Sequence, residues 1–332
     1  SIGASAPKTN FGELTTDGYE LTLNYGHTFA NGLRINVGGQ LTDYKSTITQ
    51  WNSAADPTIG NYYDGYVLGS IWGFKAERLF QKSDFEYDQD GKLVTVVVDG
   101  KTQNVYKNLA PGYQKAMESN TAAFMFGPGD VMFKDLDGDG IIDYGSNTIG
   151  DPGDRTIIGN NQPRYIYGIR LGGTWKGFDL DMFFQGVGKR SLWATGNTVL
   201  PGYTGSEQAF KGTDDYWTED NTGAYFPRPR DYGQTAKWNY VCNDRYMLNM
   251  AYLRLKSLVV GYTLPTNITK KVMIQKARIY FSGENLLTFD KLANTAVDPE
   301  TDWTDVTEGD SRSFGRSYPY SKSISFGIQV DF

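Results

Sequence analysis

The sequence of 332 residues predicts an all-β fold, namely an antiparallel segment of a transmembrane β-barrel with long extracellular loops. Three observations predict it. Apolar and polar residues alternate along about seven stretches, as they do in strands with one apolar and one wetted face. Long and short connections alternate strictly between those stretches. Aromatic residues, which form 14% of the chain, gather near strand ends, where membrane barrels carry their aromatic girdles.

The alternating stretches define the expected strands in chain order. They are residues 18–28, 33–45, 163–175, 178–190, 246–263, 276–287 and 320–332. The last is the clearest, because every second residue from Ile324 to Phe332 is apolar. In the fifth, the alternation slips near Ser257, which predicts a β-bulge.

The connections between these strands are of two kinds. Three are short (29–32, 176–178 and 265–275), and three are long and polar (46–162, 191–245 and 288–319). Because the two kinds alternate along the chain, all short turns should lie at one end of the sheet and all long loops at the other. Outer-membrane barrels have this layout, with short periplasmic turns and longer extracellular loops. Phe332 would then lie at the periplasmic rim.

A soluble β-sandwich is the alternative fold. It also alternates, but its apolar face is turned inward against a second sheet. The polar face of the expected strands carries charged residues that suit a water-filled lumen; they are Arg34, Arg170, Asp179, Asp181, Arg278 and Glu284. We therefore favour the barrel.

Seven strands are an odd number and do not close a bacterial barrel of this kind. An open sheet in lipid would leave backbone groups unpaired, each at a cost of several kcal/mol. We therefore expect residues 1–332 to be the C-terminal portion of a β-barrel domain. The missing strands would precede Ser1, in the same precursor or in a separate chain.

Composition excludes several classes of function. The net charge of −6 and the pI of about 5.0 argue against a nucleic-acid partner. His27 is the only histidine and Cys242 the only cysteine, so a histidine-based triad and an intrachain disulfide are both excluded. No run of 18 apolar residues provides a membrane helix.

No catalytic residue is predicted. The acidic pairs Asp214/Asp215 and Asp179/Asp181 could suggest the carboxylates of a glycosidase, but no catalytic motif surrounds them. We interpret both pairs as solvated charge. An extracellular enzyme built on a β-sandwich stays as an alternative.

The segment FKDLDGDGIID, at 133–143, resembles the calcium loop of an EF-hand. Short acidic side chains occupy the first, third, fifth and ninth positions, and Gly140 takes the sharp turn at the sixth. The predicted Ca²⁺ ligands are Asp135, Asp137, Asp139, Ile141 (through its carbonyl) and Asp143. Ser146 falls where a bidentate Glu is expected, and a metal-free turn is the alternative. The ion would stiffen the loop and take no part in chemistry.

Aromatic and polar residues of the second long loop are candidate ligand contacts. Sugar rings stack on aromatic faces while Asp, Asn and Arg bond hydroxyls, so this mixture fits a glycan and fits a peptide equally well. The candidates are Tyr216, Trp217, Tyr225, Phe226, Arg228, Arg230, Tyr232 and Trp238. Asp56, Asp64 and Trp72 are weaker candidates, and packing within the loops is the alternative for each of them.

Four parts of the chain carry a family resemblance. They are residues 1–25, residues 129–143 with 153–190, residues 252–265 with 277–289, and residues 318–332. Together they resemble the C-terminal third of a SusC/RagA-type TonB-dependent outer-membrane transporter of Bacteroidetes.

The resemblance implies a barrel of 22 strands, of which these would be about the last seven, with an N-terminal plug that is absent from this chain. It also implies a SusD-like lipoprotein lid, energy from TonB, and a place in the outer membrane of a Gram-negative cell. The expected function is active import of nutrient oligomers, most of all oligosaccharides. Peptide import, a passive porin and a structural surface protein are the alternatives.

Overall fold

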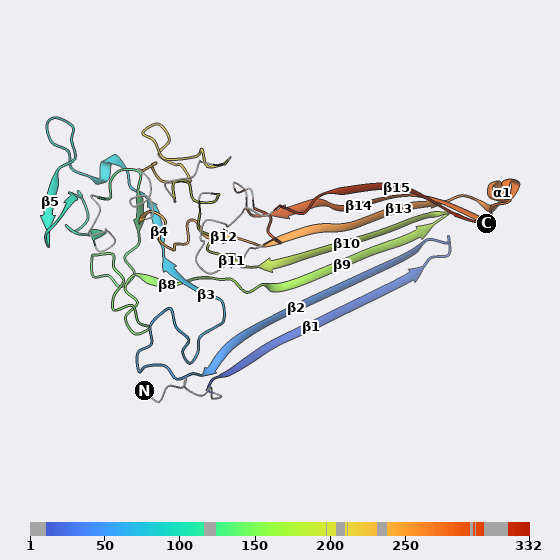
Figure 1. Ribbon diagram of the computed structural model, residues 1–332, viewed down its shortest axis with the longest axis horizontal. Helices are drawn as coiled ribbons and strands as arrows, with labels where there is room; N and C mark the ends of the chain where they lie inside the picture. Colours follow the sequence, from blue (N-terminus) through green and yellow to red (C-terminus); the bar gives the residue numbers. More distant parts are fainter. Residues whose placement is uncertain are drawn as a thin grey trace, which may run out of the picture.

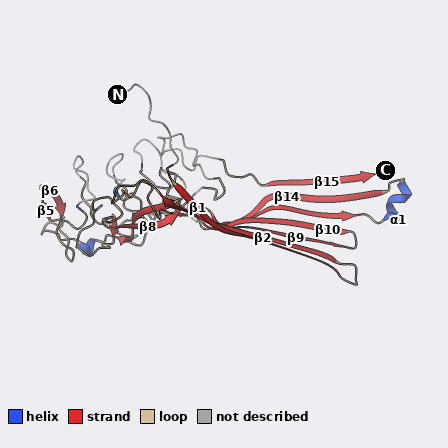
Figure 2. Cartoon of the chain, turned by 90° about the horizontal axis from the view of Figure 1, so that it is seen from below, coloured by secondary structure: helices blue, strands red, loops and turns tan. Residues whose placement is uncertain are grey.

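The computed structural model describes residues 11–115, 124–196, 198–203, 210, 212–230, 238–292, 295, 297–301 and 318–332. The described chain has two regions, a long sheet and a body of loops at one end of it (Figure 1). Seen from below, the sheet is a single layer of strands that extends away from the loops (Figure 2).

Seven strands form the sheet, in the order β1-β2-β9-β10-β13-β14-β15. They are β1 (Glu13–Thr28), β2 (Arg34–Gln50), β9 (Arg164–Trp175), β10 (Phe178–Lys189), β13 (Tyr252–Thr263), β14 (Lys276–Asp290) and β15 (Ser323–Asp331). Every neighbouring pair is antiparallel. The predicted antiparallel all-β fold is therefore confirmed. Since β1 and β15 are the two edges, the sheet is not closed by these strands.

The register brings the apolar positions of successive strands onto one face. One row runs from Tyr25 through Val37, Leu171 and Met182 to Leu258. The exposed members of this face are Leu21, Leu23, Tyr25, Val37, Ile169, Leu180, Val260, Ile279, Leu287, Ile324, Phe326 and Ile328. Among the described residues, therefore, no second layer buries the apolar face as a sandwich would require.

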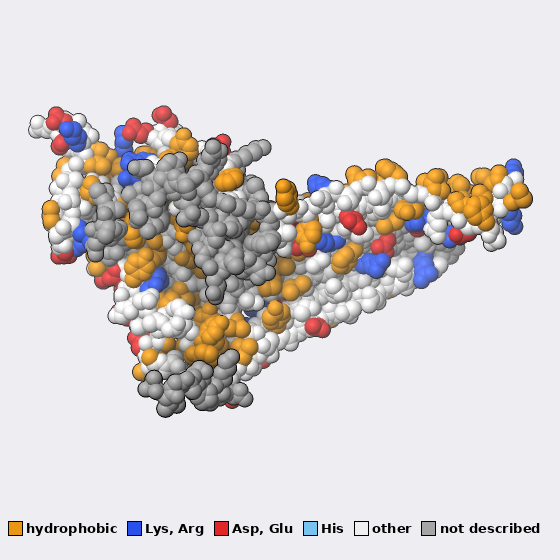
Figure 3. Space-filling model, viewed as in Figure 1, with side chains coloured by type: hydrophobic (Ala, Val, Ile, Leu, Met, Phe, Trp, Pro, Cys, Tyr) orange, Lys and Arg blue, Asp and Glu red, His pale blue; other side chains and the backbone are white. Residues whose placement is uncertain are grey.

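The opposite face carries mostly polar side chains and glycines. One of its rows runs from Asn24 through Gly38 and Arg170 to Phe183, next to the charged Asp181 two positions away. The side of the sheet seen in Figure 3 carries basic and acidic side chains among uncharged ones. This two-faced character is what the alternation predicts.

The short connections lie at the end of the sheet away from the loops. There α1 (Thr266–Thr269) and the 3₁₀ helix η4 (Lys270–Val272) join β13 to β14, and the C-terminus lies beside them (Figure 1). Among the described residues, the helices are too short and too polar to traverse a membrane.

Several strand bounds differ from the predicted ones. β1 begins at Glu13, and β2 ends at Gln50, because backbone pairing continues past the apolar alternation, with Glu13 opposite Gln50. β14 likewise runs on to Asp290, opposite Tyr252. Hydrogen bonding between strands needs no apolar side chains, so pattern alone places these ends too early.

Two other predicted strands are too long. The predicted range 246–263 begins in the structure at Tyr252, because Leu248–Asn249 (β12) pairs instead with Ser191–Leu192 (β11). The range 320–332 shortens to β15, since the Tyr320 backbone N–H donates to Asp298 of a loop, at 3.2 Å, and not to a neighbouring strand. The bulge predicted near Ser257 is confirmed by a register shift between Leu255 and Ser257.

The loop region contains short strand pairs and a core of its own. Its elements are β3 (Ser70–Phe74) with β8 (Arg155–Asn160), β4 (Ala76–Leu79) with β7 (Val131–Phe133), β5 (Thr95–Val98) with β6 (Lys101–Asn104), β11 with β12, and the 3₁₀ helix η1 (Lys82–Asp84). Its core is rich in aromatic residues; Phe80, for example, contacts Phe85 and Tyr106 with ring centres 5.3 and 5.5 Å away. The long loops thus form a packed unit.

Candidate functional site

Two clefts with aromatic walls lie among the described residues of the loop region. The first, here the Trp51 cleft, has a volume of about 590 Å³ and is lined by Trp51, Asp56, Tyr62 and Tyr66, among others. The Trp51 and Tyr62 rings meet edge to face with centres 5.4 Å apart. The Asp64 carboxylate accepts a hydrogen bond of 2.5 Å from the Trp51 backbone N–H. Of the weaker sequence candidates, Asp56 therefore lines this cleft, and Asp64 contacts one of its lining residues.

The second cleft, here the Trp72 pocket, has a volume of about 460 Å³. Three indoles line it, those of Trp72, Trp193 and Trp238, together with Tyr144 and Arg155. β3 supplies Trp72, β8 supplies Arg155, and Trp193 directly follows β11. These short strands lie next to the sheet in Figure 1, so the pocket lies near the loop end of the sheet.

Most of the aromatic residues predicted as ligand contacts are packed inside the loop region. Trp217 and Phe226 are 4% and 1% exposed, and Tyr225 packs against Phe226 with ring centres 4.8 Å apart. Tyr216 is exposed. Burial leaves Trp217 and Phe226 without surface for a ligand, because the aromatic side chains of this loop form its core.

The basic candidates of this loop are also held internally. Arg230 pairs with the buried Asp130 and donates to the Met125 carbonyl. Arg228 is half-buried, and its pKa is lowered by burial and by the charge of Arg230. Tyr232 lies outside the described residues. Trp238 alone of the eight lines the Trp72 pocket.

Three carboxylates gather at the predicted calcium loop. Asp135, Asp137 and Asp154 each have an oxygen within 4.8 Å of the others. Asp154 is buried and accepts backbone hydrogen bonds from Leu136 and Asp143, at 2.7 and 2.8 Å. Burial raises the pKa of Asp154, and the charges of Asp137 and Asp135 raise it further. Backbone N–H groups donate to all three carboxylates, but within the described residues no cation forms an ion pair with them.

The other two predicted carboxylate ligands of Ca²⁺ accept local backbone hydrogen bonds and lie outside this cluster. The Asp139 and Asp143 carboxylates accept hydrogen bonds from the backbone N–H groups of Ile141 and Gly145, at 2.9 and 2.6 Å. Neither is among the three clustered carboxylates. Asp154 was not predicted, because it lies beyond the spacing of an EF-hand loop and only the fold brings it back to Asp135.

Ion pairs cross the polar face of the sheet. Arg278 of β14 reaches Asp179 of β10 across the intervening strand β13. It passes over Gly261, where an added Cβ would lie 2.5 Å from both side chains. Arg170 pairs with Asp181 at 3.1 Å. The acidic pair Asp179/Asp181 is therefore neutralised by arginines, as expected for structural charge.

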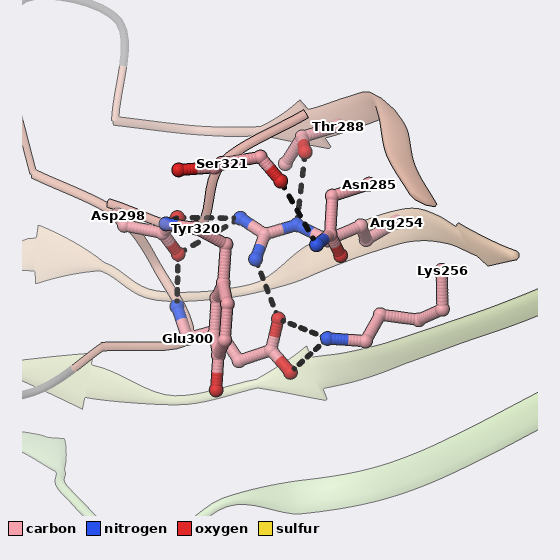
Figure 4. Close-up of polar contacts among 8 residues, drawn as sticks. All are labelled: Arg254, Lys256, Asn285, Thr288, Asp298, Glu300, Tyr320 and Ser321. Carbon is pink, nitrogen blue, oxygen red and sulfur yellow. Dashed lines mark hydrogen bonds and ion pairs between the residues drawn. The ribbon is translucent and has the colours of Figure 1, made fainter. Parts of the chain in front are cut away.

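At the loop end of the same face, a buried cluster ties a loop to the wall of the sheet (Figure 4). Arg254 of β13 donates to both Asp298 oxygens at 2.8 and 2.9 Å and to Glu300 at 2.5 Å. Lys256 donates to both Glu300 oxygens. The Tyr320 ring lies over the two cations, with its centre 4.4 Å from Lys256 Nζ and 5.4 Å from Arg254 Cζ. We call these five residues the Arg254 latch.

Both curated proteins described here that are similar to this chain are TonB-dependent receptors. No family model matches the chain. TonB-dependent receptor P3 of Formosa agariphila is 26% identical over 347 residues, which cover 99% of this chain and 30% of that receptor. TonB-dependent receptor P26 of the same organism is 24% identical over 346 residues, with the same coverage.

Solved structures agree in fold. The RagAB peptide transporter matches with a TM-score of 0.59 and 21% identity, covering 97% of this chain and 30% of that chain. The RagAB peptide importer in its open-open state matches with a TM-score of 0.60 and 19% identity, over 97% and 29%. The chain is thus similar in sequence to TonB-dependent receptors and similar in fold to the RagAB transporter. It spans about 30% of the length of the relatives that it matches.

The Arg254 latch also shows which face of the sheet this loop covers. Arg254 lies on the polar face, opposite Gln185 and Thr288 in the register, and it pairs with Asp298 and Glu300 of the loop. Among the described residues, the loop therefore folds over the polar face and leaves the apolar face of the sheet open.

Proposed function

We propose that this chain forms part of an outer-membrane, TonB-dependent importer of nutrient oligomers, most of all oligosaccharides. The observation that carries the proposal is the two-faced sheet, with an uncovered apolar face and a polar face of arginine–aspartate pairs. Lipid stabilises such an apolar face, whereas a soluble protein would have to cover it. The similarity to TonB-dependent receptors supports the energy source.

The proposed mechanism contains no covalent step. The loops capture the oligomer at the cell surface, a SusD-like lipoprotein closes over it, and TonB displaces a plug so that the ligand enters the lumen. The plug and the strands that complete the barrel would come from outside residues 1–332. The relatives are named receptors and transporters, which supports a protein that is not an enzyme.

The clefts favour oligosaccharides as cargo. The Trp51 cleft and the Trp72 pocket both combine aromatic walls with a few charged or polar groups, and that combination suits rings with hydroxyl edges and apolar faces. Peptides are the second candidate, because the solved neighbours are described as peptide transporters.

Uptake by cells that carry the complete receptor tests the function. We expect uptake of fluorescent oligosaccharides to stop when the receptor gene is deleted and when a protonophore collapses the energy supply of TonB. Uptake that continues with the protonophore would show a passive porin. Energy-dependent uptake of peptides, with none of oligosaccharides, would assign peptides as the cargo.

We also propose that a structural Ca²⁺ ion is bound at Asp135 and Asp137, with Asp154 as a further ligand. Hard carboxylate oxygens suit Ca²⁺, and a cation would relieve the repulsion among three carboxylates within 4.8 Å. Asp139, Asp143 and the Ile141 carbonyl would complete the shell. The ion would stiffen the turn between β7 and β8.

Thermal unfolding of the complete receptor tests the calcium proposal. Adding millimolar Ca²⁺ after EDTA treatment should raise the unfolding temperature of the loop region. Asp137→Asn should abolish the rise, whereas Asp90→Asn, at an exposed acidic residue in another turn, should keep it. An equal rise in the two variants would exclude this site.

A further inference from the structure

The Trp72 pocket is lined by a cation, Arg155, that forms no ion pair with a carboxylate among the described residues. The Arg155 guanidinium donates through Nε to the Pro152 carbonyl at 3.2 Å and through Nη2 to the Tyr144 carbonyl at 2.7 Å. Its Cζ lies 4.9 Å from the centre of the Tyr144 ring. Within the described ranges, Nη1 has no acceptor, and no carboxylate forms an ion pair with Arg155. Asp143 is near enough to interact with it electrostatically but makes no contact.

Three other arginines are satisfied differently. Arg254, Arg230 and Arg164 each pair with a carboxylate that is at most 6% exposed. Arg155 is partly buried, and its hydrogen bonds go to two carbonyl groups while the Tyr144 ring lies against its guanidinium. Leaving a partly buried cation without a counter-charge is costly. An anion supplied by a ligand would remove that cost.

The walls around Arg155 suit a ring. Three indoles and Tyr144 surround a volume of about 460 Å³, which is within the range of ligand pockets, roughly 300–1,000 Å³. The Trp72 indole N–H is buried and has no acceptor among the described residues. Native proteins rarely leave a buried donor unpaired, and such groups mark sites whose partner is missing. Among the described residues, the pocket therefore combines apolar walls with a guanidinium that has no carboxylate partner and an indole N–H that has no acceptor.

We propose that the Trp72 pocket binds one acidic sugar residue of an oligosaccharide, a pyranose that carries a carboxylate or a sulfate ester. The apolar ring face packs on the indoles while the anionic group accepts hydrogen bonds from Arg155. A single acidic pyranose supplies both features on one rigid ring. This inference rests on the proposed function and specifies the cargo as an anionic glycan.

Calorimetry and tryptophan fluorescence of the complete receptor in detergent test whether the pocket binds an acidic sugar. The probes are tetragalacturonate, its carboxyl-reduced neutral counterpart, a sulfated galactan tetramer and tetraglutamate. We expect at least one of the acidic sugars to bind at least 10-fold more tightly than the neutral tetramer and to change tryptophan fluorescence. The carboxylate and sulfate probes identify which anion the pocket takes. A charge-assisted hydrogen bond contributes on the order of 10- to 100-fold in affinity.

Three variants connect the effect to Arg155. Arg155→Gln should remove the preference for the acidic tetramer, and Arg155→Lys should keep part of it, because the charge remains. Lys134→Gln removes one exposed positive charge from the same region and should leave the preference unchanged. If Arg155 were only structural, Gln and Lys would weaken neutral and acidic probes alike and leave the ratio intact.

The results that would contradict this inference differ from those that would contradict the proposed function. Equal binding of acidic and neutral tetramers, no binding of either acidic sugar, or an unchanged preference in Arg155→Gln overturns the acidic-sugar pocket. So does Arg155-dependent binding of tetraglutamate without binding of acidic sugars. Protonophore-sensitive uptake of neutral oligosaccharides would leave the proposed function standing in each of these cases.

Discussion

The sheet and the loop region of this chain use their apolar side chains in opposite ways. In the sheet, Leu23 and Phe326 are 64% and 80% exposed. In the loop region, Phe80 and Phe133 are completely buried. The two regions are built from one chain and have similar aromatic residues, so residue type alone does not determine burial.

The difference shows what stabilises each region. The loop region gains hydrophobic stabilisation from its own packing and needs no lipid, as expected for a body that faces water. The sheet has hydrogen-bonded strands but no core, so its apolar face must be covered by something that the chain does not supply. A bilayer, as proposed above, would cover that face without demanding shape complementarity, which fits the wide range of side-chain sizes on it.

Removing a buried ring from the loop region should have the largest effect. Phe80→Ala deletes a side chain packed between Phe85 and Tyr106, and such a change costs about 3–5 kcal/mol. We expect hydrogen exchange to speed up throughout the loop region while the strands of the sheet stay protected. Val97→Ala, at a position 65% exposed, is the control. Equal loss of protection in the sheet would show that the two regions do not unfold separately.

A charge placed on the apolar face of the sheet should have the second-largest effect. Leu23→Arg places a guanidinium toward lipid, which costs about 2–4 kcal/mol near the middle of a bilayer. Thr22→Arg places the same group on the polar face, next to Gln40 in the register, and should be tolerated. The folded fraction in outer membranes, read from heat-modifiable gel mobility, compares them. Greater harm from Thr22→Arg would reverse our assignment of the two faces.

The sequence predicts the sheet far better than the loop region, for a physical reason. Each strand satisfies a local rule, since period-two alternation fixes which side chains share a face. Even the bulge near Ser257 is visible as a slip in that alternation. The strand ends, such as Glu13 and Asp290, were misplaced because pairing outside the apolar band depends only on backbone geometry.

The loop region obeys no such local rule. Trp217 and Phe226 have the composition of ligand contacts but lie in a core assembled from distant segments. Trp72 and Arg155 are far apart in sequence and meet only because β3 pairs with β8. Asp154 and Asp135 are also separated in sequence and are brought together only by the fold. Pattern therefore predicted the kinds of side chain that form the sites, but not which of them would stay on the surface.

The Arg254 latch joins the two regions and allows a smaller, sharper test. A double-mutant cycle with Arg254→Met and Asp298→Leu isolates the interaction of a pair in which both side chains are at most 5% exposed. We expect a coupling free energy of about 0.5–3 kcal/mol, measured by thermal unfolding of the loop region. Lys322→Met, at an exposed residue near the same junction, combined with Asp298→Leu, should show no coupling. Zero coupling between Arg254 and Asp298 would mean that the loop region does not depend on the latch.

The pH dependence of the latch should be the smallest effect, and its direction follows from Asp298. Burial opposes ionisation of this carboxyl, but hydrogen bonds from the Glu300 backbone N–H and from Arg254 outweigh it and hold the pKa below its ordinary 3.8. A lowered pKa in the folded state adds stability above the unfolded value, and that stability is lost as pH falls through the folded value. The latch contribution should therefore be constant from pH 8 to pH 5 and should decline only below about pH 4. Unfolding scans of wild type and Asp298→Asn measure it as the difference between their profiles. A difference that changes between pH 5 and pH 8 would show that the Asp298 carboxyl is not held ionised by Arg254, and that the two regions are joined by other contacts.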